Sequence, residues 1–249
     1  MARNPDNGLI WARAEPSIRK PRFSREMIAA AALEIADTEG FDAVSMRDVA
    51  SALGAATMTL YNYVRTKDDL VALMHDAIMA EILVPAGELP AAWRDAVTLI
   101  AGRIRAALVR HPWAVGAMQE AQPGPNAIRA LEQYLAAVGD SRLTRAQKFD
   151  LLTAVNAYVF GNVLITVGTR KRAESEAGDP DLVEQVFALT NTLLETGEFP
   201  HTAELLIQRT TPDDNAPPVR DDDQGVEEQF HRGLAALLDG LSARFAAGG

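Results

Sequence analysis

The chain has 249 residues, 48% of them hydrophobic, and a formal net charge of −10. This composition predicts a globular protein with a sizeable buried core, and the acidic balance argues against a general nucleic-acid binder. No cysteine is present, which excludes disulfides, thiolate zinc sites and cysteine nucleophiles and is compatible with a reducing cytosol. The first twenty residues contain no continuous apolar stretch, so we expect no signal peptide and a cytoplasmic protein.

Charge is unevenly distributed along the chain. Residues 1–25 carry six basic and two acidic side chains, whereas residues 26–70 carry three basic and eight acidic ones. Residues 1–20 therefore form a basic arm, which we expect to be flexible. Such an arm either contacts an anion or is only a solubilising tail, and its charge does not distinguish the two.

The first predicted helix covers residues 24–39, with Ser24 as its N-cap and Gly40 as its end. Ser45 and Asp48 have the spacing of a capping box, which predicts a second helix from Met46 to Gly54. A third short helix is predicted over residues 57–63 after only three residues.

Helical periodicity continues to the end of the chain, and no window shows the alternation of a half-buried strand, so the predicted fold is all-α. Thr66 and Asp69 form a second capping box, which begins a long helix that runs to about Val84. Residues 210–225 are rich in Pro and Asp and predict a mobile loop. The remaining predicted helices are 93–110, a short one after Pro112, 126–138, 144–171, 180–195, 201–208 and 225–246.

Residues 151–169 contain no charged side chain and are long enough to span a bilayer. They also contain two Asn and three Thr, and small residues recur at helical spacing: Ala154, Ala157, Gly161 and Gly168. We therefore favour a soluble helix in a helix–helix interface, with no membrane partner. Together with the apolar last helix it would form a homodimeric four-helix bundle; the alternative is a core pair within one chain.

Two short helices joined by Gly54-Ala55-Ala56 and braced by an earlier apolar helix have the layout of a helix-turn-helix. The second helix carries Thr, Met, Asn and Tyr, whose side chains suit base edges, the thymine methyl and phosphates. Lys67 begins the following helix, where its ammonium and the helix N-terminus would hold a phosphate. Arg47 is placed to reach a guanine. The partner that this pattern predicts is double-stranded DNA.

Residues 22–72, which include ALEIADTEGFDAVSMRDVASALGAATMTLYNYVRTKDDLV, resemble the DNA-binding domain of the TetR family of transcriptional regulators. RHPWAV at 110–115 and FHRGLAALLDGLSAR at 230–244 resemble the C-terminal domain of its tetracycline-repressor branch. The resemblance implies a helix-turn-helix domain over 21–70 and a ligand-binding and dimerisation domain over 71–249. It further implies a homodimeric repressor that binds a palindromic operator and releases it when a small-molecule effector binds.

The resemblance also implies roles for individual residues of the head. Phosphate contacts are implied for Tyr61 and Lys67, and core positions for Val49, Leu53 and Leu60. This chain has Ala56 where many members have a Ser or Thr cap, so the recognition helix is expected to start less firmly. Base or groove contacts are implied for Arg47, Thr57, Met58, Thr59, Asn62 and Tyr63.

The effector pocket is predicted by the same resemblance. Met118 falls where tetracycline-binding members keep a metal-ligating His, and a thioether does not ligate Mg²⁺. We therefore expect no tetracycline–magnesium chelate, no metal site and no cofactor, but a largely apolar or aromatic effector. The predicted pocket residues are Trp113, Met118, Leu131, Tyr134, Phe149, Leu152 and Asn156.

Enzymatic chemistry has little support in the sequence. GxSxG, Walker, GxGxxG and HExxH motifs are absent, and His75, His111, His201 and His231 are scattered without metal-ligand spacing. We predict no catalytic residue and no enzyme. Two alternatives remain: an all-α small-molecule carrier or enzyme without DNA binding, and an all-α dimeric scaffold that has lost DNA binding.

Overall fold

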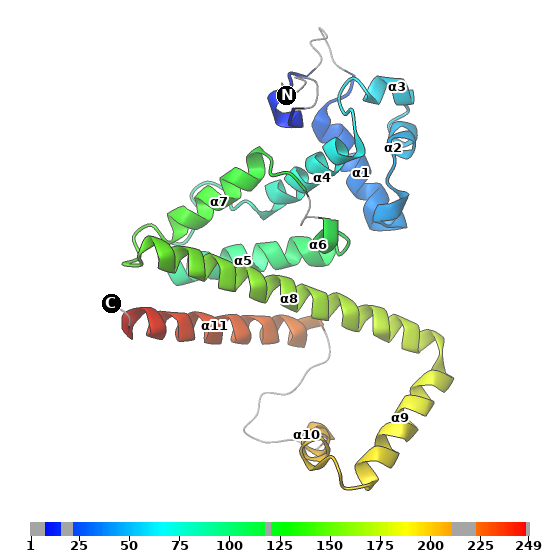
Figure 1. The fold of residues 1–249 in the computed structure, drawn as a ribbon, viewed down its shortest axis with the longest axis vertical. Coiled ribbons are helices and arrows are strands. Elements are labelled where there is room, and N and C mark those ends of the chain that lie inside the picture. The colour runs from blue at the N-terminus through cyan, green and yellow to red at the C-terminus, as the bar shows by residue number, and fades with distance from the viewer. Residues whose placement is uncertain (1–7, 16–21, 118–120, 211–222, 248–249) are drawn as a thin grey trace, which may run out of the picture. The chain divides into compact units, whose positions relative to one another are not determined.

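The computed structural model describes residues 8–15, 22–117, 121–210 and 223–247. Within these ranges every regular element is a helix, which confirms the all-α prediction (Figure 1). The 3₁₀ turns are η2 (Ile10–Ala12) and η3 (Phe41–Ala43). The α-helices are α1 (Arg25–Glu39), α2 (Met46–Ala52), α3 (Thr57–Leu60), α4 (Lys67–Ile82), α5 (Trp93–Arg110), α6 (Ala114–Ala117), α7 (Pro125–Ala137), α8 (Arg145–Gly178), α9 (Pro180–Glu195), α10 (Pro200–Thr210) and α11 (Asp223–Ala247).

The chain divides into two compact units. The first contains the residues up to Val163 together with those from Leu237 onwards, and the second contains Leu164–Ala236. Helices α8 and α11 therefore contribute to both units. The helix-turn-helix and the main cavity lie in the first unit.

Local sequence signals set the start and end of the helices in the head. The Ser24 hydroxyl accepts a hydrogen bond from the backbone N–H of Met27 (3.2 Å), and the Ser45 hydroxyl accepts one from Asp48 (3.2 Å). Gly40 follows α1 with φ +92°, a conformation that L side chains rarely adopt. The buried apolar residues of the head include Ile28, Ala32, Ile35, Val44, Val49, Leu60 and Val64.

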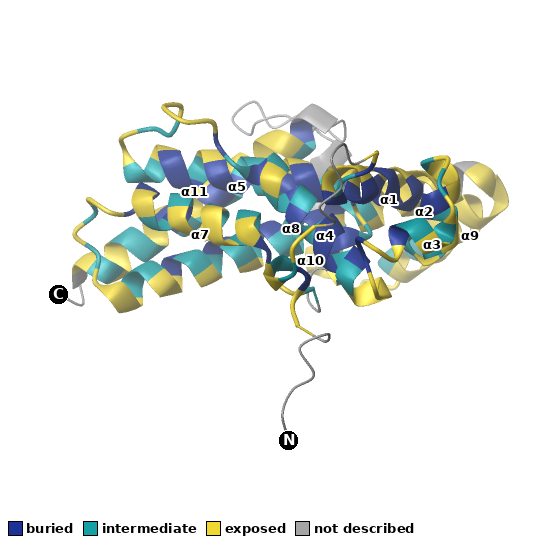
Figure 2. Ribbon diagram, turned by 90° about the horizontal axis from the view of Figure 1, so that it is seen from above, coloured by how far each residue is buried: buried dark blue, intermediate teal, exposed yellow. Residues whose placement is uncertain are grey.

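Helix α4 connects the head to the rest of the first unit. It begins with the predicted capping box, in which the Thr66 hydroxyl accepts from Asp69 N–H and the Asp69 carboxylate accepts from Thr66 N–H. The helix packs against α1, α5 and α7 (Figure 1). Its buried Met74 and Ile78 belong to this shared core, and the buried faces of α1, α4 and α5 are visible in Figure 2.

Side chains connect the ends of the helices in the first unit. Gln133 on α7 exchanges two hydrogen bonds with the backbone of Val84, at 3.0 and 2.7 Å. Arg94 on α5 donates to the Leu238 carbonyl (3.3 Å) and the Ser242 hydroxyl (2.9 Å) of α11 and pairs with Asp239. The C-terminal part of α11 is thereby attached to α5.

Helix α8 is longer than predicted: the predicted helix ends at residue 171, whereas α8 continues to Gly178. Residues 170–178 contain no proline and several good helix formers, so nothing ends the helix before Asp179 and Pro180. Residues Arg145–Ser175 are long and apolar enough to cross a membrane by length and composition, and 28% of the most apolar window is buried. In the second unit α9 exposes Val186, Phe187 and Leu189.

Two segments predicted to be flexible are described only in part. In the basic arm, residues 8–15 are described; Ile10 is buried, at 1% exposure, whereas Leu9 is 51% exposed. Of the predicted mobile loop 210–225, residues 211–222 lie outside the described residues. Its edges are helical, since Thr210 ends α10 and Asp223 begins α11.

Candidate functional site

The helix-turn-helix is formed by α2 and α3. Gly54, with φ +62°, turns the chain between them, and Ala55 N–H donates to the Ala50 carbonyl (2.9 Å). The short α3 buries Leu60 completely and leaves Met58 74% exposed, so its outer face is available for contacts. Ala56 makes no side-chain capping bond, as its methyl group dictates.

A hollow in the surface of the head brings four of the predicted DNA-binding residues together. Arg47 on α2, Thr57 and Tyr61 at the two ends of α3, and Lys67 at the start of α4 all line it. Two cations and the hydroxyl groups of Ser45, Thr57 and Tyr61 therefore line one concave surface, together with the Asp42 carboxylate. This combination suits the phosphate and base-edge contacts of nucleic acid.

Charges at this hollow are fixed by neighbouring groups. The Arg47 side chain is 84% exposed, and its Nε lies 3.5 Å from the Asp48 carboxylate. The Ser45 hydroxyl lowers the pKa of Asp48, with a smaller contribution from the Arg47 charge, so Asp48 is ionised at neutral pH. The Lys67 ammonium lies 5.5 Å from the centre of the Phe41 ring.

The remaining predicted DNA contacts differ in exposure. Asn62 is exposed and Thr59 is half-buried. Tyr63 is 4% exposed and packs within the head, which leaves its side chain little surface for a groove contact. The physical reason is the chain reversal after α3, where Tyr63 N–H donates to the Leu60 carbonyl (2.8 Å). Of the implied core residues Val49 and Leu60 are buried and Leu53 is half-buried.

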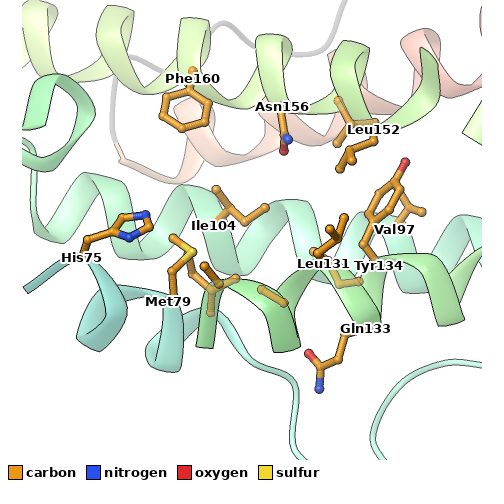
Figure 3. Close-up of a pocket in the computed structure, with 15 residues that line it drawn as sticks. His75, Met79, Val97, Ile104, Leu131, Gln133, Tyr134, Leu152, Asn156 and Phe160 are labelled. Carbon is orange, nitrogen blue, oxygen red and sulfur yellow. The ribbon is translucent and has the colours of Figure 1, made fainter. Parts of the chain in front are cut away.

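The second site is an apolar cavity of about 340 Å³ between α4, α5, α7 and α8 (Figure 3). Its walls are mainly aliphatic and aromatic, with a few polar side chains, which is the usual make-up of a small-molecule pocket. The lining residues are His75, Met79, Ile82, Val97, Ile100, Ile104, Ala127, Ala130, Leu131, Gln133, Tyr134, Leu152, Val155, Asn156 and Phe160.

Four of the seven predicted pocket residues line this cavity: Leu131, Tyr134, Leu152 and Asn156. Phe149 does not, and is 48% exposed on α8. Met118 lies outside the described residues.

Trp113 is also absent from the cavity wall, because its ring has other partners. It stacks on Phe41 with ring centres 5.3 Å apart, and its indole N–H donates to Asp37 (2.7 Å). Both partners belong to the head, so Trp113 joins the head to the helices behind it.

Two buried polar atoms at the cavity have no hydrogen-bond partner among the described residues: the Tyr134 hydroxyl and Nδ1 of His75. Burial raises the pKa of Tyr134 well above its ordinary value, so its hydroxyl stays protonated. Burial also lowers the pKa of His75, an effect that the neighbouring Asp76 charge only partly opposes. At neutral pH both groups are therefore uncharged.

The other two polar residues at the cavity differ in direction. Figure 3 shows the Asn156 amide directed from α8 toward the cavity, whereas the Gln133 amide is turned away, toward its bonds with Val84. In the part of the chain that the structure describes, no group of three or more His, Asp or Glu side chains is arranged to hold a metal ion.

The residues of α4 and α5 were not predicted as pocket residues. His75, Met79 and Ile82 are spaced i, i+4 and i+7, which places them on one face of α4. Val97, Ile100 and Ile104 have the same kind of spacing on α5. The spacing is visible in the sequence, but plain core packing produces the same pattern, so it could not identify the cavity.

Comparison with known families gives two matches that together cover most of the chain. Residues 28–74 match the family described as bacterial regulatory proteins, tetR family. Residues 86–245 match the tetracyclin repressor-like C-terminal domain. The first match contains the hollow's lining residues, and the second contains most of the cavity.

Curated relatives are named as transcriptional regulators. An HTH-type transcriptional regulator of Saccharopolyspora erythraea is 36% identical over 174 residues, 69% of this chain and 72% of that protein. The HTH-type transcriptional repressor DrrR1 of Streptomyces coeruleorubidus is 29% identical, over 94% of this chain and 83% of that one. Tetracycline repressor class D of Escherichia coli is 26% identical over 91% of this chain and 92% of that one.

Solved structures share the fold. ActR from Streptomyces coelicolor in complex with actinorhodin aligns with a TM-score of 0.70 and 23% sequence identity. The alignment covers 91% of this chain and 99% of the ActR chain. A TetR variant from Acinetobacter baumannii in complex with minocycline has a TM-score of 0.58 at 18% identity, covering 90% and 98%.

Proposed function

Because this chain belongs to the TetR family, and is therefore a ligand-responsive DNA-binding regulator, we propose that it represses transcription as a homodimer on a palindromic operator. A small molecule that enters the cavity between α4, α5, α7 and α8 would release the DNA. The observation that carries the proposal is the hollow that Arg47, Thr57, Tyr61 and Lys67 share at the exposed end of the helix-turn-helix. Regulators of this kind are soluble proteins. We assign this one to the cytoplasm, because the proposed operator DNA lies there.

The predicted DNA-binding residues at and beside the hollow each have a proposed part in DNA binding. Tyr61 and Lys67 hold backbone phosphates, and the amides at the start of α4 add to the positive potential there. Arg47 and Thr57, together with Met58, Thr59 and Asn62, read base edges and methyl groups in the major groove. The phosphate contacts set affinity and the groove contacts set sequence preference.

The exposed side of α8 supports the homodimer. Leu164 and Ile165 are 59% and 71% exposed, and a Cβ atom at Gly161 or Gly168 would have no atom from elsewhere in the chain within 4 Å. A second copy packed on this stripe would cover apolar surface and allow two helices to approach closely. A soluble dimer interface thus accounts for the apolar length of α8 without a membrane.

The effector proposed for the cavity is a largely apolar or aromatic molecule. The cavity volume of about 340 Å³ and the mainly aliphatic wall favour a hydrophobic body. Tyr134 offers a hydroxyl donor, while the neutral His75 offers a ring nitrogen that accepts or donates according to its tautomer. An effector with a carbonyl or phenol group near each would satisfy both atoms.

Release follows from the position of α4. Its middle and end line the cavity through His75, Met79 and Ile82, and its first residue is Lys67 at the DNA surface. An effector acts only through its different affinity for two conformations of the dimer. A tilt of α4 in the liganded form would change the spacing of the two heads, which must match half-sites about 34–36 Å apart.

Selection of bound sequences from a random duplex library, followed by fluorescence anisotropy, tests the proposal. Tyr61→Ala and Lys67→Ala should each weaken binding to the selected duplex by on the order of tenfold, and Lys67→Ala should reduce the salt dependence by about one ion. The control is Arg142→Ala, an exposed arginine that precedes α8. Unchanged affinity in both head variants, or no selected sequence at low salt, would contradict the proposal and favour a carrier or scaffold without DNA binding.

A further inference from the structure

The described part of the N-terminal arm is built into the fold, although it precedes the head. Residues 9–13 form a turn in which Ala12 N–H donates to the Leu9 carbonyl (2.9 Å) and Arg13 N–H to the Ile10 carbonyl (3.2 Å). Ile10 is 1% exposed and is among the largest fully buried side chains of the protein. A tail that served only solubility would not bury an isoleucine. We call residues 8–15 the strap.

One end of the strap holds the start of α4. The Arg13 guanidinium pairs with the Asp69 carboxylate, and both side chains are largely buried, at 15% and 13% exposure. Asp69 is the third residue of α4 and also accepts hydrogen bonds from Arg65 N–H (3.0 Å) and Thr66 N–H (3.3 Å). Arg13 therefore neutralises the carboxylate that fixes the first turn of α4, two residues after Lys67.

The other end of the strap holds the joint between α4 and α7. A Cβ atom at Gly124, the N-cap of α7, would lie 2.5 Å from Cζ2 of Trp11 and 2.3 Å from Oδ1 of Asp76. Glycine is therefore required for this close approach. Asp76 on α4 accepts from the backbone N–H of Asn126 (2.7 Å) and from its side-chain amide (2.9 Å). Trp11 thus covers the point where α4 caps α7.

Both helices at this joint line the effector cavity. His75 precedes Asp76 on α4, and Ala127 follows Asn126 on α7. An effector that changes the spacing of α4 and α7 must therefore act directly beside Trp11. The strap reaches from that point to Asp69, at the beginning of α4 and next to the DNA surface.

We propose that the strap is a coupling element that fixes the α4–α7 joint to the first turn of α4. Through the strap, a change at the cavity alters the position of the first turn of α4, which carries Lys67. This effect adds to any tilt of α4 itself. This inference rests on the proposed function for its role in regulation, but the mechanical link between the two sites is a property of the free protein.

Hydrogen–deuterium exchange of the free full-length chain tests the link without DNA or effector. The measured peptides cover residues 66–71, whose amides form the first turn of α4, and residues 124–128, whose Asn126 amide is held by Asp76. Trp11→Ala should speed exchange in residues 124–128, which Trp11 contacts, and also in the distant residues 66–71. Arg13→Gln should speed exchange in residues 66–71, which Arg13 contacts, and also in the distant residues 124–128. The expected change is on the order of tenfold at each distant peptide.

Leu9→Ala is the matched control, since Leu9 belongs to the same segment but is 51% exposed. It should leave both peptides unchanged. If each substitution loosens only the peptide that it contacts, or neither, the strap is not a connector and the proposal is overturned. Circular dichroism and the exchange of α5 report separately whether a variant has lost its fold.

A second arm adds the duplex selected with the wild-type chain. Because coupling between sites is reciprocal, DNA binding should change exchange in residues 124–128 of the wild type, and Trp11→Ala should reduce that change at least severalfold. Equal changes in both proteins would overturn the regulatory role of the strap. If the free-protein link is present but no duplex is ever selected, the failure belongs to the proposed function and to the regulatory role built on it, not to the link.

Discussion

Trp113 donates its indole N–H to Oδ1 of Asp37, with 2.7 Å between the two atoms. The same oxygen lies 2.8 Å from Nδ1 of the buried His111, whose Nε2 is 3.3 Å from Glu81. Asp37 is in the last turn of α1, whereas His111 and Trp113 follow α5. A single carboxylate therefore joins the DNA-binding head to the pocket helices.

Asp37→Ala should destabilise the protein, because it removes the acceptor shared by the Trp113 indole and the buried His111 ring. The expected loss is about 1–3 kcal/mol in the free energy of unfolding, and Asp37→Asn should lose less because it keeps an acceptor oxygen. Thermal and urea unfolding measure the difference. Asp42→Ala, an exposed carboxylate of the same head, is the control and should change stability by less than about 0.5 kcal/mol. Equal stability of all four proteins would show that the joint is unimportant.

Predictions from the sequence succeeded where the determining interactions are local. Ser24, Ser45 and Thr66 were expected to cap helices, and each accepts the backbone bond three residues ahead. A cap is decided by residues within one turn, so the chain order is enough to identify it. For the same reason the helix-turn-helix was recognisable from its short helices and its Gly54 turn.

Predictions that depended on the direction of a side chain in the tertiary structure were less successful. Trp113 follows His111-Pro112 as expected, but its ring is directed by Phe41 and Asp37, which lie more than seventy positions earlier. The packing of Ile10 against the fold could not be predicted either, because the apolar run Leu9-Ile10-Trp11 is too short to show a helical or strand period. The positions of such side chains depend on contacts between residues far apart in the chain, and local sequence patterns do not predict these contacts.

Removing the Tyr134 hydroxyl should stabilise the free protein. That oxygen is buried without a partner among the described residues, so Tyr134→Phe relieves a desolvation cost of about 1 kcal/mol while keeping the ring. The melting temperature should rise by several degrees, which thermal unfolding measures. Tyr158→Phe, at a half-buried tyrosine, should not raise the melting temperature, because that tyrosine has interactions of its own. A lower melting temperature for Tyr134→Phe would mean that its hydroxyl is bonded in solution.

His75 should make the protein less stable in mild acid. Burial lowers its pKa in the folded state, so between that value and the ordinary pKa of about 6.5 the unfolded chain binds more protons than the folded one. Stability must then fall as the pH drops below about 6.5. His75→Gln should lose less of its melting temperature than the wild type between about pH 7.5 and 5.5. His201→Gln, on an exposed histidine, should behave as the wild type does. Parallel curves for all three proteins would contradict the assignment.

Gly161 offers the clearest test of the dimer, because no other helix of the single chain comes within 4 Å of a Cβ atom placed there. Apart from its chain neighbours and the backbone of its own helix, no atom would lie within 4 Å of the Cβ of a leucine there, so the fold of the monomer should survive and gain helix propensity. In the proposed interface the same side chain prevents close approach of the two helices. Sedimentation velocity should therefore show Gly161→Leu dissociating at concentrations where the wild type is dimeric. Gly102→Leu on α5, also with open space around its Cβ, should remain dimeric. If Gly161→Leu keeps the wild-type association constant, the second copy packs elsewhere, and the exposed Leu164 and Ile165 would need another explanation.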